Sequence, residues 1–278
     1  MMPRRDVRPA AVAGSWYPGN KAQLEAAVDA HLAAAAPPSE GPCPRALIAP
    51  HAGLVYSGPV AAHAYALVRR CRYSAVVLVG PSHFVAFQGV SIWPRGTWES
   101  PLGDVPVAEE LARAIAGRSR DITEHPAAHS REHSLEMQLP FIARLLPHVP
   151  IVPLVMGNQS RATAIGLGQT LGDILQAHAD RDILLVASSD LSHYEDAETA
   201  SKLDNIVLQC VAEFSADGLM DALEREPRHA CGGGPMVSVL SAASQLGCRQ
   251  SQVLRYADSG DVSGDKSAVV GYMAAAIW

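Results

Sequence analysis

The sequence is short of the features that mark membrane proteins and nucleic-acid-binding proteins. It contains no uninterrupted apolar run of about 18 residues, the length that a membrane-spanning helix requires. No apolar stretch of signal-peptide length follows the opening Met-Met-Pro-Arg-Arg. No long basic run occurs, and the formal net charge is -6, from 22 basic and 28 acidic side chains. We therefore expect a cytoplasmic protein that binds neither nucleic acid nor a membrane.

Cysteine is also sparse, and its spacing suggests no pairing. The five cysteines lie at positions 43, 71, 210, 231 and 248, an odd number without a CxxC motif. This pattern argues against a disulfide framework and is typical of a reducing cytoplasm. Cys43, Cys71, Cys210 and Cys248 carry no functional signal, whereas Cys231 precedes a run of three glycines.

Several common catalytic and binding motifs are absent. The chain has no P-loop, no GxGxxG opening a helix after a strand, no GxSxG elbow and no HExxH. The acidic segment Ser259–Asp265, "SGDVSGD", does not have the ligand spacing of a calcium loop. We interpret it as a turn between two strands.

What the sequence does contain is an alternation of strand and helix patterns. Apolar residues make up 48% of it, which is enough for a substantial core. Short apolar runs predict strands covered on both faces over Ala46–Ala49, Ser74–Val79, Ile151–Met156 and Ile183–Ala187. Helices are expected over Lys21–Ala36, Pro59–Arg69, Val107–Ala116, Ser134–Leu146, Ala162–Ala179, Ala197–Glu224 and Pro235–Leu246, with Pro140 kinking its helix or marking a late start. Two more strands are expected at the C-terminal end, over Gln252–Tyr256 and Ser267–Ala274.

This order predicts an α/β fold with a central, mainly parallel or mixed sheet flanked by helices. The linker-like stretch Pro37–Pro44 comes too early to separate two domains, so we expect a single domain over residues 1–278. In open α/β sheets the ligand site lies at the carboxyl ends of the strands. Residues that follow the predicted strands are therefore the first candidates for function.

Imidazoles follow three of these strands. His51 comes directly after the first strand, His83 follows the second in "GPSH", and Asp190 and His193 follow the fourth in "SSDLSHY". A single histidine after a strand is more often structural, as a cap or a turn residue. Three in the same topological position predict a shared crevice, although only the fold can bring His51 and His83 together.

Two further segments fit the same crevice. "HSREHSLEMQLP" carries His129, Glu132, His133 and Glu136 near the start of a predicted helix, where a capping or solvent-exposed role is the alternative. "HACGGGPM" places Cys231 before three glycines and a helix start, where the glycines would allow close approach to a ligand. The alternative there is a small buried cysteine in a tight turn.

These residue types indicate a transition metal. Two neutral imidazoles with a carboxylate are typical of non-heme Fe(II), and two imidazoles with a thiolate suit zinc, iron or copper. The spacing leaves the choice between these donor sets open.

The motifs together resemble one family. "VAGSWYPGN", "APHAGLVYSGPVAAHAY", "VGPSH", "SPLGDVPV", "EHSLEMQLPF", "ASSDLSHY", "CGGGP" and "SGDVSGD" occur in the order found in the Memo-like proteins, whose bacterial members are called AmmeMemoRadiSam system protein B. The resemblance extends from about Arg8 to the C-terminus. It implies a fold similar to the class III extradiol dioxygenases, which open catechol rings with Fe(II). The family name also implies a functional association with radical SAM proteins.

By the same resemblance, His51, His83 and Cys231 match the metal-site positions. Asp190 and His193, and by motif also His133, match polar residues of the pocket and are the expected catalytic groups. The dioxygenases have a carboxylate where this chain has Cys231, which puts ring cleavage in doubt. The resemblance thus predicts a metal-binding, redox-type protein, and a metal-dependent oxidoreductase if it is an enzyme. Fe(II) is the first choice of metal, with copper or zinc as alternatives.

Two alternatives stay open. A binding protein could use the inherited pocket for a peptide or small molecule, with Trp16, Tyr17, Tyr56 and Trp98 as lining residues. A cysteine-dependent hydrolase or transferase would use Cys231 as nucleophile, with His193 or His133 as base. The sequence does not indicate the substrate or the oligomeric state.

Overall fold

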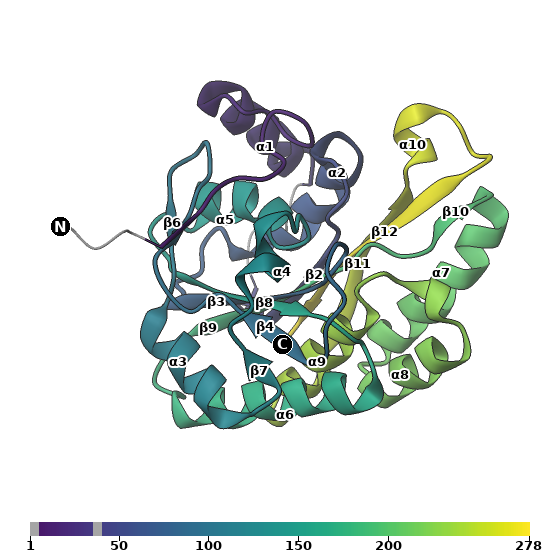
Figure 1. Ribbon diagram of the computed structural model, residues 1–278. Helices are drawn as coiled ribbons and strands as arrows, with labels where there is room; N and C mark the ends of the chain where they lie inside the picture. Colours follow the sequence, from purple (N-terminus) through teal and green to yellow (C-terminus); the bar gives the residue numbers. More distant parts are fainter. Residues whose placement is uncertain (1–5, 36–40) are drawn as a thin grey trace.

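The computed structural model describes residues 6–35 and 41–278, and its centre is a mixed β-sheet (Figure 1). The strand order is β10-β12-β2-β9-β3-β8-β4-β7, and β11 pairs with β12. Four parallel strands form the middle: β2 (Ala46–Ala49), β9 (Ile183–Ser188), β3 (Ala75–Pro81) and β8 (Ile151–Met156). Every residue of these four is buried, because helices cover both faces of the sheet, which explains their continuous apolar sequences.

The outer strands make the sheet mixed. β12 (Val269–Ile277) runs antiparallel to β2 and pairs with β11 (Ser251–Asp258) and β10 (His193–Glu195). On the other side, β4 (Val90–Ile92) runs antiparallel to β8 and parallel to β7 (Ile122–Thr123). A small second sheet consists of β1 (Val7–Arg8), β5 (Thr97–Trp98) and β6 (Val105–Pro106).

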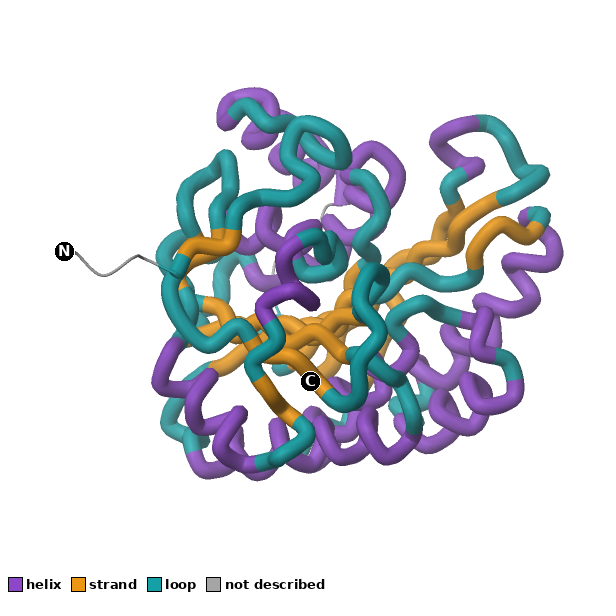
Figure 2. The backbone as a smooth tube through the Cα atoms, in the orientation of Figure 1, coloured by secondary structure: helices purple, strands orange, loops and turns teal. Residues whose placement is uncertain are grey.

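Helices form a layer on each side of the sheet (Figures 1 and 2). One layer contains α1 (Lys21–Ala35), α2 (Leu54–Tyr65) and α5 (Leu139–Leu145). The other contains α3 (Glu109–Arg118), α6 (Arg161–Ala177), α7 (Ala197–Ala212), α8 (Ala216–Arg225) and α9 (Gly233–Gln245). The short helices are η1 (Ala66–Val68), α4 (Pro126–Ser130), η2 (Glu136–Gln138), η3 (Pro227–His229) and α10 (Gly260–Ser263). Within the described ranges, none of the helices combines the length and apolarity needed to cross a bilayer.

The fold class predicted from the sequence is confirmed, and so are the central strands. Two helices differ from their predictions. α2 begins at Leu54, because Gly53 serves as its N-cap and Pro59 lies inside the helix instead of opening it. The single helix expected over 197–224 is two helices: Phe214 adopts a positive φ of 54° and Ser215 caps the N-terminus of α8.

Other predicted details agree with the structure. The helix expected over 134–146 starts late: η2 precedes α5, and Pro140 lies in the first turn of α5, where a missing N–H costs nothing. The acidic segment 259–265 connects the antiparallel strands β11 and β12 and contains α10. Ala36 and the first half of the predicted linker Pro37–Pro44 lie outside the described residues.

The expectation that no disulfide forms was wrong. Cys43 and Cys71 are bonded, with their Cα atoms 5.8 Å apart, and Cys210, Cys231 and Cys248 are free. Cys43 precedes β2 and Cys71 follows η1, so the helix that returns along the sheet brings the two ends of this β–α unit together. Spacing along the chain could not show this, because the partners are 28 residues apart and the number of cysteines is odd.

Candidate metal centre

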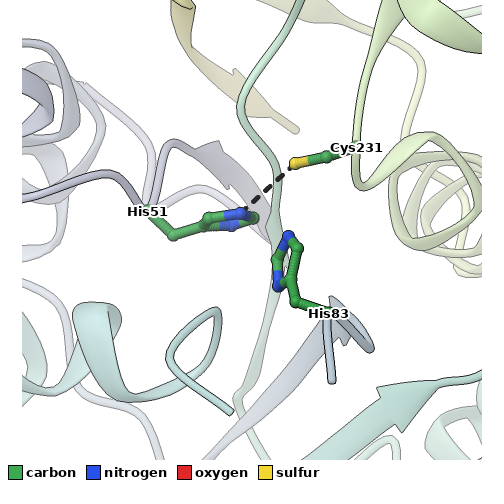
Figure 3. A group of neighbouring side chains, drawn as sticks. All are labelled: His51, His83 and Cys231. Carbon is green, nitrogen blue, oxygen red and sulfur yellow. Dashed lines mark hydrogen bonds between the residues drawn. The ribbon is translucent and has the colours of Figure 1, made fainter. Parts of the chain in front are cut away.

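Three loops bring two imidazoles and one thiol together at one end of the sheet (Figure 3). His51 follows β2, His83 follows β3, and Cys231 precedes α9. His51 Nε2 lies 3.3 Å from Cys231 Sγ, and the ring centroids of His51 and His83 are 5.2 Å apart. One donor atom from each residue lies within 4.8 Å of the other two, so the three side chains could hold a metal ion.

His51 is fixed through both its backbone and its ring. Its N–H and that of Ala52 donate to Asp190 Oδ1, at 2.7 and 3.3 Å, and its Nδ1 lies 2.9 Å from Ser188 Oγ. The ring is almost completely buried. Burial, and then the neighbouring His83, hold the pKa of His51 well below its ordinary value. The imidazole is therefore neutral near pH 7, the form that binds a metal.

His83 is oriented by the buried carboxylate of Glu132. Glu132 Oε1 lies 2.8 Å from His83 Nδ1, and Oε2 accepts the His83 N–H at 2.6 Å. Because a carboxylate only accepts, Nδ1 carries a hydrogen, and Nε2 is the ring nitrogen that a metal would use. Burial by itself raises the pKa of Glu132, but the hydrogen bonds from His83 outweigh it and lower this pKa to about 2. In known metal sites, a histidine ligand commonly donates a hydrogen bond from its other ring nitrogen to a carboxylate.

A second group of donor atoms, from His83, Glu132 and His133, also lies within 4.8 Å. Glu132 already accepts three N–H groups, two from His83 and one from Ser134 at 2.8 Å, so we assign it to the orientation of His83. The His133 ring stacks on His83, with centroids 4.5 Å apart, and lies 4.2 Å from the ring of Trp16. Burial, followed by the charges of the neighbouring histidines, lowers the pKa of His133 to about 3. Its Nδ1 has no hydrogen-bond partner among the described residues.

Asp190 and His193 follow β9 but have different hydrogen-bond partners. The Asp190 carboxylate accepts the backbone N–H groups of His51 and Ala52, so it holds their loop in place. Burial raises the pKa of Asp190 to about 6, against the opposing effect of the His51 hydrogen bond. His193 is half-buried, and its Nδ1 lies 2.8 Å from the carbonyl oxygen of Leu191. No hydrogen bond joins Asp190 to His193 in the described structure, so these two expected catalytic groups do not form a hydrogen-bonded pair.

The glycines after Cys231 let its loop approach β9. A Cβ at Gly232 would lie 2.4 Å from the carbonyl oxygen of Ser188, so a larger residue would push the loop away. The Cys231 carbonyl accepts from Gln159 Nε2 at 2.6 Å, and its N–H donates to the Asp190 carbonyl at 3.3 Å. Burial, and then the charge of Asp190, raise the pKa of the Cys231 thiol. The first of the three glycines, Gly232, thus admits the neighbouring backbone of β9, whereas Gly233 and Gly234 lie against side chains.

The whole chain matches known proteins in sequence. The family model described as Memo-like protein matches residues 8–276. The chain belongs to the Memo-like family. MEMO1 family proteins of Sulfurisphaera tokodaii and Thermotoga neapolitana are 36% and 38% identical to it, over 96% and 97% of this chain and 98% and 99% of theirs. A MEMO1 family protein of Methanosarcina mazei is 42% identical over 82% of this chain and 83% of its own length.

The fold is also similar to that of a solved structure. An uncharacterized protein from Escherichia coli K12 superimposes with a TM-score of 0.57, covering 82% of this chain and 98% of that chain. The sequence identity is 16%, so this likeness concerns the fold alone.

In this Memo-like chain, hydrogen bonds connect the N-terminal segment to the loop that carries Glu132. Arg8 is fully buried and donates to the carbonyl oxygens of His129 and Glu132 and to the carboxylate of Glu136. Tyr17 also donates to Glu136, at 2.7 Å. Glu136 is thus neither a cap nor a solvent-exposed residue, the two alternatives considered from the sequence.

No role for Ser188, Gln138 or Arg8 was predictable from the sequence, and the role of Glu132 was open. A carboxylate flanked by histidines in "HSREHS" was a signal for Glu132. For the other three no local signal exists, because their partners come from distant segments. The four aromatic residues considered as pocket lining differ in exposure. Trp16 and Tyr56 are partly exposed, whereas Tyr17 and Trp98 are buried.

Proposed function

We propose that this Memo-like protein binds a transition metal through His51, His83 and Cys231 and uses it in redox chemistry on a small molecule. The observation that carries the proposal is the convergence of three donor atoms from three separate loops within 4.8 Å. Two imidazoles and a sulfur suit iron, copper and zinc, and Fe(II) is the first candidate because of the resemblance to the dioxygenases.

The side chains fit a cation in three respects. Each imidazole forms a hydrogen bond through its Nδ1, His51 with Ser188 and His83 with Glu132. The Nε2 atoms are therefore available for a metal. Burial keeps His51 neutral, so no proton has to leave it before a metal binds. Cys231 must lose a proton, and a cation would stabilise the thiolate in a site where burial disfavours it.

The surrounding residues can bind and move protons. A redox-active metal, when bound, would supply electron transfer and positions for a small ligand. The Leu191 carbonyl can only accept, so His193 Nδ1 carries a hydrogen and its Nε2 is free to take a proton. The His133 ring stacks on His83, and its buried Nδ1 has no hydrogen-bond partner among the described residues and lies 3.7 Å from Glu132 Oε1. Asp190 holds the His51 loop.

Metal content per chain tests the proposal. The protein is purified without oxygen, and metals are quantified in wild type, Cys231→Ser and Cys210→Ser. Cys210 is the matched control, because it is also a free, half-buried cysteine. We expect about one equivalent of metal in wild type and in Cys210→Ser, and a sharp loss in Cys231→Ser. Equal metal content in all three, or no metal after reconstitution, would contradict the proposal.

A second candidate function is the binding of a ligand or peptide without catalysis. Exposed aromatic side chains lie next to the site loops: Trp16 and Phe84 contact His133, and Tyr194 follows His193. Binding that persists in metal-free protein would favour this function. The cysteine nucleophile is less well supported: Cys231 faces His51, not the predicted bases His193 or His133, and its thiol has a raised pKa.

A further inference from the structure

The hydroxyl of Ser188 connects the ring of His51 to the core. Ser188 ends β9 and pairs with Ala49 at the end of β2, so its side chain lies beside the loop of His51. Its Oγ lies 2.6 Å from the carbonyl oxygen of Ser134, 2.7 Å from Gln138 Nε2 and 2.9 Å from His51 Nδ1. All four of these polar residues are buried, so hydrogen bonds to solvent do not compete.

Two of the three hydrogen bonds have only one possible direction. The carbonyl oxygen of Ser134 accepts, so it takes the hydroxyl hydrogen of Ser188. The orientation of Gln138 is fixed by its other contacts: Nε2 donates to the carbonyl oxygen of Pro50 at 3.1 Å, and Oε1 accepts from the Tyr65 hydroxyl at 2.9 Å. Exchanging the amide atoms would set two acceptors against each other at Pro50. Gln138 therefore donates to Ser188.

We infer that Ser188 and Gln138 are positioning residues that hold neutral His51 as its Nδ1–H tautomer. A hydroxyl has one hydrogen and two lone pairs. Ser134 takes the hydrogen and Gln138 one lone pair, which leaves a lone pair for His51, so Nδ1 is the donor. Nε2 then has a free lone pair that faces Cys231 Sγ at 3.3 Å. In metal-free protein this lone pair accepts the thiol hydrogen.

The tautomer decides how readily His51 can act as a ligand. With the hydrogen on Nδ1, Nε2 can bind a metal at once. With the hydrogen on Nε2, the ring must first exchange it. This step rests on the proposed function, because it takes Nε2 to be the ligand atom, whereas the tautomer itself is a property of the metal-free protein.

Nitrogen-15 NMR of the metal-free protein tests the tautomer directly. Two-bond correlations between ring hydrogens and ring nitrogens distinguish the two neutral forms, and His51→Gln identifies the signals of His51. At neutral pH we expect the Nδ1–H form in wild type and a loss of this preference in Ser188→Ala. Ser188→Thr, which retains the hydroxyl, should keep the Nδ1–H form. Ser238→Ala is the matched control, because it removes a buried hydroxyl whose hydrogen bonds, within the described ranges, are to the carbonyl oxygens of Ala164 and Gly234.

Titration with Co(II) then connects the tautomer to metal affinity. We expect Ser188→Ala to bind Co(II) roughly 10- to 100-fold more weakly than wild type, and Ser238→Ala to bind it equally well. An Nε2–H tautomer in wild type, or an unchanged tautomer in Ser188→Ala, overturns the inference even if Co(II) binds. An Nδ1–H tautomer without Co(II) binding supports the inference and overturns the proposed metal function. If Ser188→Ala does not fold, the wild-type spectrum alone decides.

Discussion

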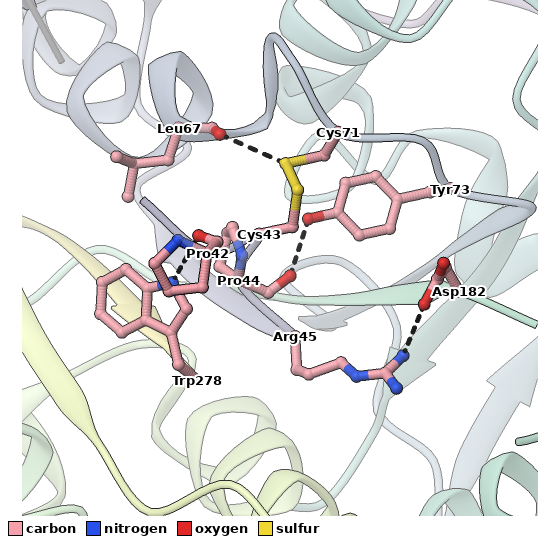
Figure 4. Close-up of a disulfide and its surroundings, with 9 residues drawn as sticks. All are labelled: Pro42, Cys43, Pro44, Arg45, Leu67, Cys71, Tyr73, Asp182 and Trp278. Atoms are coloured by element: carbon pink, nitrogen blue, oxygen red, sulfur yellow. Dashed lines mark hydrogen bonds and ion pairs between the residues drawn. A yellow bond between two sulfur atoms is a disulfide. The ribbon is translucent and has the colours of Figure 1, made fainter. Parts of the chain in front are cut away.

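The disulfide between Cys43 and Cys71 closes a covalent loop around the segment that carries His51 (Figure 4). The loop of 28 residues contains β2, the His51 loop, α2 and η1. A hydrogen bond also joins the chain beside its two ends, since the Tyr73 hydroxyl donates to the carbonyl oxygen of Pro44 at 2.7 Å. In the chain-entropy model, closing a loop of this length in the unfolded chain stabilises the fold by about 3.5 kcal/mol.

We therefore expect the double variant Cys43→Ser/Cys71→Ser to unfold at a lower temperature than the wild type. The stability loss corresponds to a fall in Tm of roughly 7 to 14 °C, measured by circular dichroism on metal-free protein. Reduction of the wild type should lower its Tm by a similar amount, whereas Cys210→Ser should change it little. Thiol titration of unfolded, unreduced wild type should find only Cys210, Cys231 and Cys248. Five reactive thiols, or a Tm that reduction does not change, would refute the reasoning.

Two further variants test the supports of the site. Glu132→Gln removes the charge that orients His83. We expect a roughly 10- to 100-fold loss of Co(II) affinity in a competition titration, with little change in Tm. An unchanged affinity would show that Glu132 does not contribute to the site. Arg8→Leu leaves the carboxylate of Glu136 buried without its cation, and we expect urea unfolding to show a loss of about 3–5 kcal/mol. Arg8→Leu/Glu136→Gln should lose less than Arg8→Leu, and an equal or larger loss would show that the ion pair is not the cause.

The strands at the centre of the sheet were predictable because their sequences are short, continuous and apolar. Strands such as β3 and β8 are buried on both faces, and continuous β-branched apolar runs are typical of that environment. The marginal strands β1, β5, β6 and β7 have two residues each, too few for any periodicity. The break before α8 did have a local signal, since Ser215 is a preferred N-cap residue.

In the candidate site, too, one part was predictable from the sequence and another part was not. The topological rule for ligand positions placed His51, His83 and His193 near one end of the sheet. The glycine run after Cys231 indicated that this residue belongs to the same crevice, and a resemblance in sequence matched it to the metal-site positions. What the sequence could not supply was the set of partners that orient these side chains. Ser188 reads as the end of a strand and Gln138 as a helix residue, and only the packing of β9 against η2 turns them into hydrogen-bond partners.

The position of β2 in the sheet has a consequence for the time at which the site can form. β2 lies between β9 and β12, so both of its neighbours in the sheet are synthesised long after it. His51 and Cys231 are 180 residues apart in the chain. Contacts of such sequence separation form late, since the cost of closing the intervening loop comes first. A nascent chain thus carries His51 on an incomplete sheet until β9 and β12 have been made, and an ion could be held jointly by His51 and Cys231 only after residue 231 has left the ribosome.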